Sequence, residues 1–275
     1  MSLKSRYTSA CVTGASSGLG KAIAEALRAQ GIEVWGTSRN PESLSLEAHE
    51  GAQHWLSLDL ADADSLASFV ERLRQEAPGF DLFINNAGFG AAYPFENFST
   101  EAFERQLEVL LAAPALLCRT VYPRMLQRGR GCLVNVSSLA AQFPLPFLSA
   151  YNASKAGLSG LSRSLDLECP QPEVRIIDFR PGDFRTNFGR ATELPAIPGG
   201  RSDYARSLQR QLALMAEAPL PQKAARDLIN ALEKGRRGTV CSGTFFQARM
   251  APLLARVSPW SIQRKILRRY MGLAG

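Results

Sequence analysis

Short apolar runs and longer amphipathic stretches alternate along most of the chain. Runs rich in β-branched and aromatic residues predict strands at Ala10–Thr13, Glu33–Thr37, Trp55–Leu58, Phe80–Ile84, Cys132–Val136, Val174–Phe179 and Gly238–Cys241. Stretches with helical spacing or composition predict helices at Lys21–Gln30, Ala61–Glu76, Glu101–Gln127, Ala150–Glu168, Asp203–Ala218 and Gln222–Lys234. This alternation predicts an α/β fold, in which helices cover both faces of one doubly wound, Rossmann-type parallel sheet.

The chain shows no linker that would divide it, so we expect residues 1–275 to form a single domain. After Phe179 the regular alternation stops. Residues 187–201 are rich in Gly, Pro and Arg and predict a loop; with the helix that follows they predict a lid at 187–218. Residues 247–275 predict a basic, amphipathic, partly helical extension.

The composition is typical of soluble globular proteins, with 275 residues, 45% hydrophobic and 21% charged. The sequence contains no run of eighteen apolar residues, so it predicts no membrane span. Its N-terminus does not resemble a secretory signal. Only two histidines and five scattered cysteines are present, which argues against a disulfide framework, a zinc site and histidine-based catalysis. We therefore expect no metal, and a reducing cytoplasmic location.

The net charge of +7 is concentrated near the C-terminus. Arg249–Gly275 contains six basic residues and no acidic one, so the rest of the chain is nearly neutral and lacks the charge of a nucleic-acid-binding protein. A helix within 259–271 would place Ile262, Ile266 and Tyr270 on one stripe and the cations on the other side. Such a helix fits either peripheral contact with an anionic membrane, or a cover for the ligand pocket or a neighbouring subunit.

Three residues near the middle of the chain carry the most informative chemistry. Ser138 stands thirteen residues before Tyr151, and Lys155 follows Tyr151 by four. On a helix, positions i and i+4 share a face, so the ammonium can lie close to the phenol. A nearby positive charge lowers the pKa of a phenol from about 10, which favours proton exchange with an alcohol or carbonyl oxygen. Alone, this Tyr–Lys spacing is common on surface helices, so the other motifs decide.

The first of these motifs is the glycine-rich turn Thr13–Gly20, which lies between a predicted strand and a predicted helix. Gly14 permits a tight turn. Gly18 and Gly20 allow close backbone approach at the helix N-terminus, where free N–H groups favour a phosphate. A glycine-rich turn is a weak signal by itself, and the strand–turn–helix context strengthens it.

The second motif lies at the end of the second predicted strand. NAD-binding domains usually place an acid about twenty residues after the glycine turn, where it binds the ribose 2′-hydroxyl. Here Ser38 and Arg39 occupy that place. A guanidinium can bind a 2′-phosphate that a carboxylate would repel, so the sequence predicts NADP(H) rather than NAD(H). A solvated loop arginine is the alternative interpretation.

The third motif, Asn85–Gly88, directly follows the strand predicted at Phe80–Ile84. Its small residues would let the backbone approach a ligand, and an Asn amide could brace neighbouring strands, although an ordinary turn has the same composition. Taken together, the chain resembles the short-chain dehydrogenase/reductase family over nearly its whole length. The resemblance rests on the order and spacing of Thr13–Gly20, Asp59-Leu60, Asn85–Gly88, Ser138, Tyr151, Lys155, Pro181-Gly182 and Thr186.

The resemblance implies an oxidoreductase that interconverts a carbonyl and a secondary alcohol with NADP(H). Tyr151 would be the general acid or base, Lys155 would lower its pKa and hold the nicotinamide ribose, and Ser138 would polarise the substrate oxygen. Cofactor contacts are also implied for Gly14, Ser16, Ser17, Gly18, Leu19, Gly20, Ser38, Arg39, Asp59, Leu60, Asn86, Ala87, Gly88, Pro181, Gly182, Phe184 and Thr186. Because family members often form dimers or tetramers, the resemblance also implies a homo-oligomer.

One position departs from the family pattern. The resemblance aligns Leu110 with an asparagine that anchors a water next to the catalytic lysine, and leucine cannot hydrogen-bond. Gln106, one turn earlier, is a candidate substitute. The alternative function is therefore an NADP(H)-binding regulatory or scaffold protein with weak or no turnover.

Apolar residues flank the predicted site and bear on the substrate. They are Phe89, Tyr93, Phe143, Pro144, Phe147, Phe184 and Phe188. Such residues favour a hydrophobic carbonyl or secondary alcohol, for example a lipid-like, sterol-like or aromatic ketone. Packing roles would account for them equally well.

Overall fold

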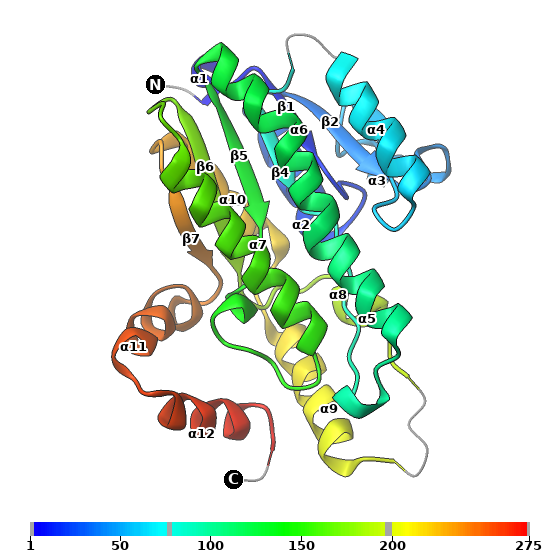
Figure 1. Cartoon of the computed structure of the whole chain (residues 1–275), viewed down its shortest axis with the longest axis vertical. Coiled ribbons are helices and arrows are strands. Elements are labelled where there is room, and N and C mark those ends of the chain that lie inside the picture. The colour runs from blue at the N-terminus through cyan, green and yellow to red at the C-terminus, as the bar shows by residue number, and fades with distance from the viewer. Residues whose placement is uncertain (1–2, 76–78, 196–199, 274–275) are drawn as a thin grey trace.

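The computed structural model describes residues 3–75, 79–195 and 200–273. Its centre is a sheet of seven parallel strands in the order β3-β2-β1-β4-β5-β6-β7 (Figure 1). The strands are β1 (Ser9–Val12), β2 (Glu33–Ser38), β3 (His54–Ser57), β4 (Leu82–Asn85), β5 (Gly131–Val136), β6 (Val174–Pro181) and β7 (Gly238–Ser242). The predicted doubly wound fold is confirmed, with the strand order reversing between β1 and β4.

The central strands form where the sequence is apolar enough to be buried on both sides. All four residues of β4 and all six of β5 are buried. The parallel register pairs Phe83 with Leu133 on one side and with Cys11 on the other. Because every strand runs in the same direction, the loops that follow the strands meet at one edge of the sheet, where ligands bind in such folds.

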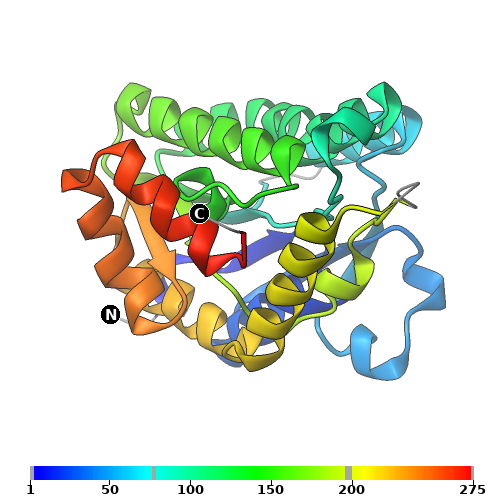
Figure 2. The same cartoon turned by 90° about the horizontal axis from the view of Figure 1, so that it is seen from below.

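Two helical layers cover the sheet (Figure 2). One layer contains α2 (Gly18–Ala29) and α10 (Pro221–Glu233); the other contains α4 (Ala63–Gln75), α5 (Thr100–Leu107), α6 (Ala113–Arg128) and α7 (Ser149–Glu168). Each layer buries an apolar stripe: Ile23 and Leu27 of α2 belong to one core cluster, and Phe69 of α4 and Leu117 of α6 to the other.

The long helix predicted at Glu101–Gln127 is interrupted by a π-helical turn, η3 (Glu108–Ala112), between α5 and α6. Pro114 stands in the first turn of α6, where a missing N–H costs little, and Pro123 lies inside α6. Within the described residues, Thr100–Arg128 is the one helical stretch long and apolar enough to cross a membrane. It packs as a core helix instead, because its apolar side lies against the sheet.

The region predicted as a lid, 187–218, is described except for residues 196–199. Its first part is not entirely a loop as predicted, since Phe188–Ala191 forms a short helix, α8. The predicted second helix is present as α9 (Ser202–Glu217). It lies beside the edge of the sheet at which the strands end (Figure 2).

The helical part of the C-terminal extension begins earlier than predicted. After β7 come a π-helical turn, η5 (Phe246–Met250), and α11 (Ala251–Val257); the predicted last helix follows as α12 (Trp260–Tyr270). The remaining short elements are α1 (Leu3–Arg6), α3 (Leu46–His49), and the 3-10 turns η1 (Pro41–Ser43), η2 (Phe95–Asn97) and η4 (Leu139–Ala141).

Candidate active site

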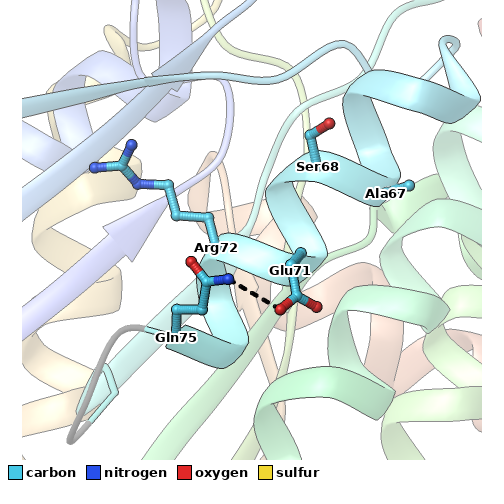
Figure 3. Close-up of a pocket in the computed structure, with 5 residues that line it drawn as sticks. All are labelled: Ala67, Ser68, Glu71, Arg72 and Gln75. Atoms are coloured by element: carbon cyan, nitrogen blue, oxygen red, sulfur yellow. Dashed lines mark hydrogen bonds between the residues drawn. The ribbon is translucent and has the colours of Figure 1, made fainter.

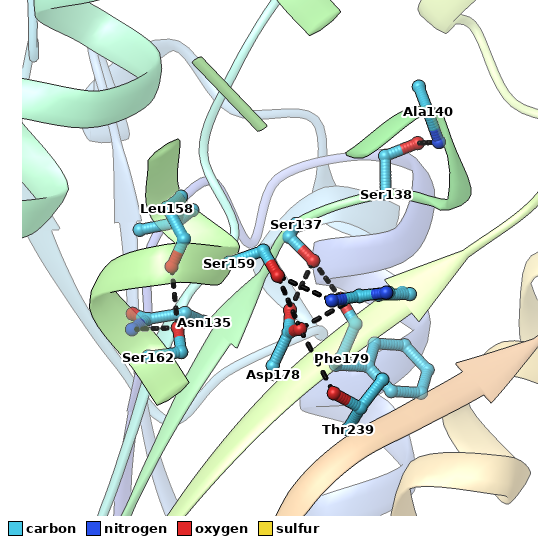
Figure 4. Close-up of polar contacts among 11 residues, drawn as sticks. Asn135, Ser137, Ser138, Ala140, Leu158, Ser159, Ser162, Asp178, Phe179 and Thr239 are labelled. Atoms are coloured by element: carbon cyan, nitrogen blue, oxygen red, sulfur yellow. Dashed lines mark hydrogen bonds and ion pairs between the residues drawn. The ribbon is translucent and has the colours of Figure 1, made fainter. Parts of the chain in front are cut away.

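The end of β5 positions the first catalytic candidate. Ser138 follows the strand in extended backbone and is only 9% exposed. Its Oγ accepts a hydrogen bond from the backbone N–H of Ala140 at 3.0 Å, which caps the turn η4 (Figure 4). This bond holds the hydroxyl at the edge of the sheet where the strands end.

The beginning of α7 positions the other two candidates. Lys155 Nζ lies 5.8 Å from the centre of the Tyr151 ring, so the two side chains share a helix face as predicted. The ammonium donates a hydrogen bond to the carbonyl oxygen of Val136, the last residue of β5, at 2.8 Å. The Ser138 hydroxyl interacts with the Tyr151 phenol. Strand and helix therefore bring all three predicted catalytic side chains together.

Burial, more than the charge of Lys155, determines the pKa of the Tyr151 phenol in this chain. Burial raises the pKa of Tyr151 to about 12, the Ser138 hydroxyl opposes this rise, and the Asp183 carboxylate adds to it. Desolvation of the phenolate outweighs the other effects. The phenol is therefore protonated at neutral pH, which is the form a general acid needs.

Lys155 titrates closer to neutral pH than a solvated lysine does. Burial lowers the pKa of its ammonium to about 8, and the negative charge of Asp178 partly offsets this effect. Asp178 lies on β6 and is 1% exposed. A carboxylate buried this deeply is costly unless it accepts hydrogen bonds, and Asp178 accepts several.

The hydrogen-bond partners of Asp178 form a network around it (Figure 4). Asp178 accepts hydrogen bonds from the hydroxyl of Ser137, from Ser159 Oγ at 2.8 Å and from Arg180 Nε at 2.8 Å. Ser159 stands one helical turn after Lys155 on α7, so the network joins the helix to β6. The sequence analysis missed this carboxylate, although an acid within a predicted buried strand was a signal for it.

The glycine-rich turn joins β1 to α2 as predicted. Gly14 and Gly18 have φ values of +65° and +56°, which side chains rarely adopt. A Cβ on Gly20 would lie 2.2 Å from the Gly14 carbonyl oxygen and 2.5 Å from Asn86 Nδ2, so only glycine fits. The first turn of α2 contains no acidic residue, and the side chain of Ser17 does not cap it. The N-terminus of α2 is therefore suited to an anion such as a phosphate.

Thr13, which was not among the predicted site residues, fastens this turn to the end of β4. Its Oγ1 accepts hydrogen bonds from the backbone N–H groups of Asn86 at 2.9 Å and Ala87 at 3.0 Å. Asn86 Nδ2 donates in return to the Thr13 carbonyl oxygen at 2.9 Å. Asn85 braces the sheet as predicted, because its Nδ2 donates to Asn135 Oδ1 on β5 at 2.8 Å.

The residues predicted to contact the adenosine half lie at the end of β2 or shortly after β2 and β3. Arg39 is exposed, and its guanidinium has no hydrogen bond or ion pair with any described residue. Its backbone is anchored, since its carbonyl oxygen accepts a hydrogen bond from Ser57 Oγ at 3.2 Å. Ser38 is half-buried beside it, Asp59 begins the turn toward α4, and Leu60 is buried in the core.

The loop after β6 returns toward the glycine turn. The Thr186 side chain would lie 3.6 Å from a Cβ on Gly18. Pro181 is buried at the end of β6, and the Gly182 N–H donates to the carbonyl oxygen of Ser242 at 2.8 Å. The side chain of Phe184 is 3% exposed and belongs to the core formed with α2 and α10. A cofactor contact at Phe184 would therefore come from its backbone.

Asp183 is a second acid that the sequence analysis missed. Burial raises the pKa of its carboxyl group, and Gln247 opposes this shift by donating a hydrogen bond from Nε2 at 2.7 Å. Gln247 belongs to η5, so the C-terminal extension reaches the loop beside Tyr151. No motif spacing connected positions so far apart in the sequence.

Leu110 lies in the π-helical turn and is 1% exposed. Its Cδ2 would be 2.7 Å from a Cβ on Gly88, so the leucine fills space against the cofactor-side loop. Gln106, the proposed substitute, is fully buried; its Nε2 donates to the Phe89 carbonyl oxygen at 3.4 Å, and its Oε1 has no partner among the described residues. Neither Leu110 nor Gln106 forms a hydrogen bond with Lys155.

Two surface hollows lie away from this site. One lies along the outer side of α4, where Ala67, Ser68, Glu71, Arg72 and Gln75 line it (Figure 3). The other lies near His49 and His54, next to Trp35 and Trp55. Neither contains a residue of the catalytic group. No cluster of three metal-ligating side chains occurs within residues 3–75, 79–195 and 200–273.

Comparison with known proteins accounts for this arrangement. A sequence model described as short chain dehydrogenase matches residues 8–195, which include the glycine turn, Ser138, Tyr151 and Lys155. The chain belongs to the short-chain dehydrogenase/reductase family. It therefore belongs to a family of oxidoreductases whose Rossmann fold binds a nicotinamide cofactor and which act on small molecules.

Relatives within the short-chain dehydrogenase/reductase family differ in activity. A 3-ketodihydrosphingosine reductase from Bacteroides thetaiotaomicron is 33% identical over 204 residues, 74% of each chain. A 2-dehydro-3-deoxy-L-rhamnonate dehydrogenase (NAD(+)) from Sphingomonas sp. is 33% identical over 206 residues, 74% of this chain and 81% of that one. A solved short-chain dehydrogenase from Streptomyces avermitilis superimposes with a TM-score of 0.77 at 30% identity, covering 94% of this chain and 97% of that one.

Proposed function

We propose that the protein is an NADP(H)-dependent oxidoreductase that interconverts a hydrophobic ketone and its secondary alcohol, with Tyr151 as general acid and base. The observation that supports this most strongly is the meeting of Ser138, Tyr151 and Lys155 at the edge of the sheet that also holds the glycine turn. The N-terminus of α2 has no side-chain cap, and Gly20 lets the backbone of the turn pack closely. Both features fit a dinucleotide. Such a cofactor, when bound, supplies or accepts the hydride.

In the direction of reduction, the protonated phenol of Tyr151 donates its proton to the carbonyl oxygen of the substrate. Ser138 Oγ lies beside the phenol and can donate a hydrogen bond to the same oxygen, which stabilises negative charge as it develops. Lys155 presents a positive charge below pH 8 that favours the phenolate left behind. In oxidation the same groups act in the reverse order.

The preference for NADP(H) is supported by the exposed, unpaired guanidinium of Arg39 after β2. A 2′-phosphate would find there a cation and no carboxylate in direct contact with it. We expect Arg39→Ala to weaken NADPH binding by roughly tenfold or more, the scale of one lost charge-assisted hydrogen bond, and to leave NADH binding nearly unchanged. Titration calorimetry with both cofactors measures this, and wild-type protein that binds NADH more tightly than NADPH would contradict it.

The hydrophobic substrate is supported by one aromatic ring beside the phenol and by the backbone of Phe147. The Phe188 ring lies edge-on to the Tyr151 ring, with centres 5.7 Å apart. Phe147 is the one described non-glycine residue with a positive φ, 65°, and its carbonyl oxygen accepts from the Tyr93 N–H at 2.7 Å. Strained backbone of this kind is found most often at ligand sites. The relative named 3-ketodihydrosphingosine reductase is consistent with a ketone substrate.

A panel of ketones tests the substrate class directly. With saturating NADPH, we expect long-chain or aromatic ketones to be reduced with a kcat/KM at least about tenfold above that of small polar ketones, the scale of a few buried methylene groups. The loss of NADPH absorbance reports turnover. If only small polar ketones react, the hydrophobic assignment is wrong.

A cofactor-binding regulatory or scaffold role is the second candidate, and Leu110 is the observation that favours it. The leucine is buried against Gly88 and offers no hydrogen bond to the proton path. A protein of this class would bind NADPH and show no turnover across the ketone panel.

A further inference from the structure

The helix α11 exposes a complete apolar stripe. Met250, the last residue of η5, and Leu253, Leu254 and Val257 of α11 recur at the spacing of one helix face, and Leu253 and Val257 are 59% and 81% exposed. Phe245 and Phe246, just before, are 76% and 59% exposed. In soluble proteins such stripes usually face the core, so a contiguous exposed one marks a contact surface.

The next helix, α12, continues this surface. Its C-terminal end contacts α9 through Arg210, whose guanidinium lies 5.8 Å over the Tyr270 ring and whose Nε donates to the Tyr270 carbonyl oxygen at 3.2 Å. Ile262 and Ile266 are left exposed at 49% and 61%. These two isoleucines are therefore not covered by other described parts of the chain.

Cations flank the exposed apolar residues. Lys265 and Arg269 follow Ile262 and Ile266 by three residues, so they lie beside these isoleucines and not on the opposite side of α12 as predicted. Arg249, Arg256 and Arg264 are exposed nearby. From Arg249 to the end of the chain there are six basic residues and no acidic one. A second copy of this chain placed on the surface would bring like charges together, whereas an anionic, apolar partner would match both features.

We propose that Phe245–Tyr270 is a membrane-binding surface for anionic bilayers. The apolar side chains enter the boundary between headgroups and acyl chains, and the cations pair with lipid phosphates. The surface lies at the active-site edge of the sheet, since η5 carries Gln247 to Asp183 and α12 lies beside α9 (Figure 2). It would therefore hold the active site next to the bilayer in which a hydrophobic ketone dissolves.

Co-sedimentation of the full-length protein with vesicles tests this surface. The vesicles are pure phosphatidylcholine, or equal parts of phosphatidylcholine and phosphatidylglycerol. We expect binding to the anionic vesicles only. Lys265→Glu/Arg269→Glu should reduce the partition coefficient roughly tenfold or more, and Leu253→Ser/Val257→Ser should reduce it as well.

Arg28→Glu/Arg163→Glu is the charge-matched control, because both arginines are exposed on α2 and α7, away from this surface. It should bind as wild type does, and circular dichroism shows whether each variant is folded. The proposal is overturned if wild type does not sediment with anionic vesicles, or if the control loses as much binding as Lys265→Glu/Arg269→Glu. Sedimentation velocity without lipid tests whether a second copy of the chain covers this surface instead. A wild-type dimer that Leu253→Ser/Val257→Ser dissociates would also overturn the membrane proposal.

Discussion

At the scale of single residues, the site is governed by burial more than by the charge pair that the sequence suggested. Tyr151 and Lys155 are on the predicted face of one helix, yet the pKa of the phenol rises and that of the ammonium falls. Spacing in a sequence shows which side chains meet, whereas the depth at which they are buried depends on the whole fold. Asp178 is the charge that burial makes important, because it opposes the loss of the ammonium's proton.

This balance predicts the alkaline limb of the pH profile. The Lys155 ammonium exists below its pKa of about 8, so kcat/KM for reduction should fall as the pH rises through 8, while the phenol, with a pKa of about 12, stays protonated. Asp178→Asn removes the charge that raises the lysine's pKa, so its limb should move to lower pH. Asp166→Asn, at the far end of α7, is the control and should leave the limb in place. An unmoved limb in Asp178→Asn would refute the role of this carboxylate.

At the scale of elements, the glycine turn was predictable, whereas the hydrogen bonds that hold it against β4 were not. Gly14, Gly18 and Gly20 stand out in the sequence because strand, turn and helix follow one another. The hydrogen bonds of Thr13 to the end of β4 depend on which strands are neighbours in the sheet. The π-helical turn at Glu108–Ala112 was also not predictable, since hydrophobic spacing does not distinguish it from an α-helix.

Two glycine substitutions separate close packing from helix propensity. Gly20→Ala places a methyl group within 2.5 Å of Asn86 Nδ2, so it should lower the free energy of unfolding by about 1–3 kcal/mol and weaken cofactor binding. Gly160 lies on an open side of α7, and an added Cβ would have nothing within 4 Å. Gly160→Ala should therefore raise the free energy of unfolding by roughly 0.5–1 kcal/mol. Urea denaturation measures both. A Gly20→Ala variant as stable as wild type would contradict the close packing of this turn against Asn86.

At the scale of the whole molecule, one parallel sheet gathers the site from distant parts of the chain. The residues that follow β1, β4, β5 and β6 meet at one edge, and this much followed from the βαβ alternation. The contact of Gln247 with Asp183, and the exposed stripe of α11, did not follow, because no periodic signal set the path of the chain after β7. The fold and the meeting of Ser138, Tyr151 and Lys155 were thus predictable, whereas the contacts around them required coordinates.

The central claim is that the Tyr151 phenol transfers the proton while the rest of the site holds the cofactor. The most direct test compares Tyr151→Phe with wild type in two assays, ketone reduction with NADPH and the rise in melting temperature that NADPH causes. The account predicts a roughly 10²–10⁴-fold lower kcat, with the thermal shift retained because binding to the native state still stabilises it. Turnover by Tyr151→Phe close to the wild-type rate would contradict the account.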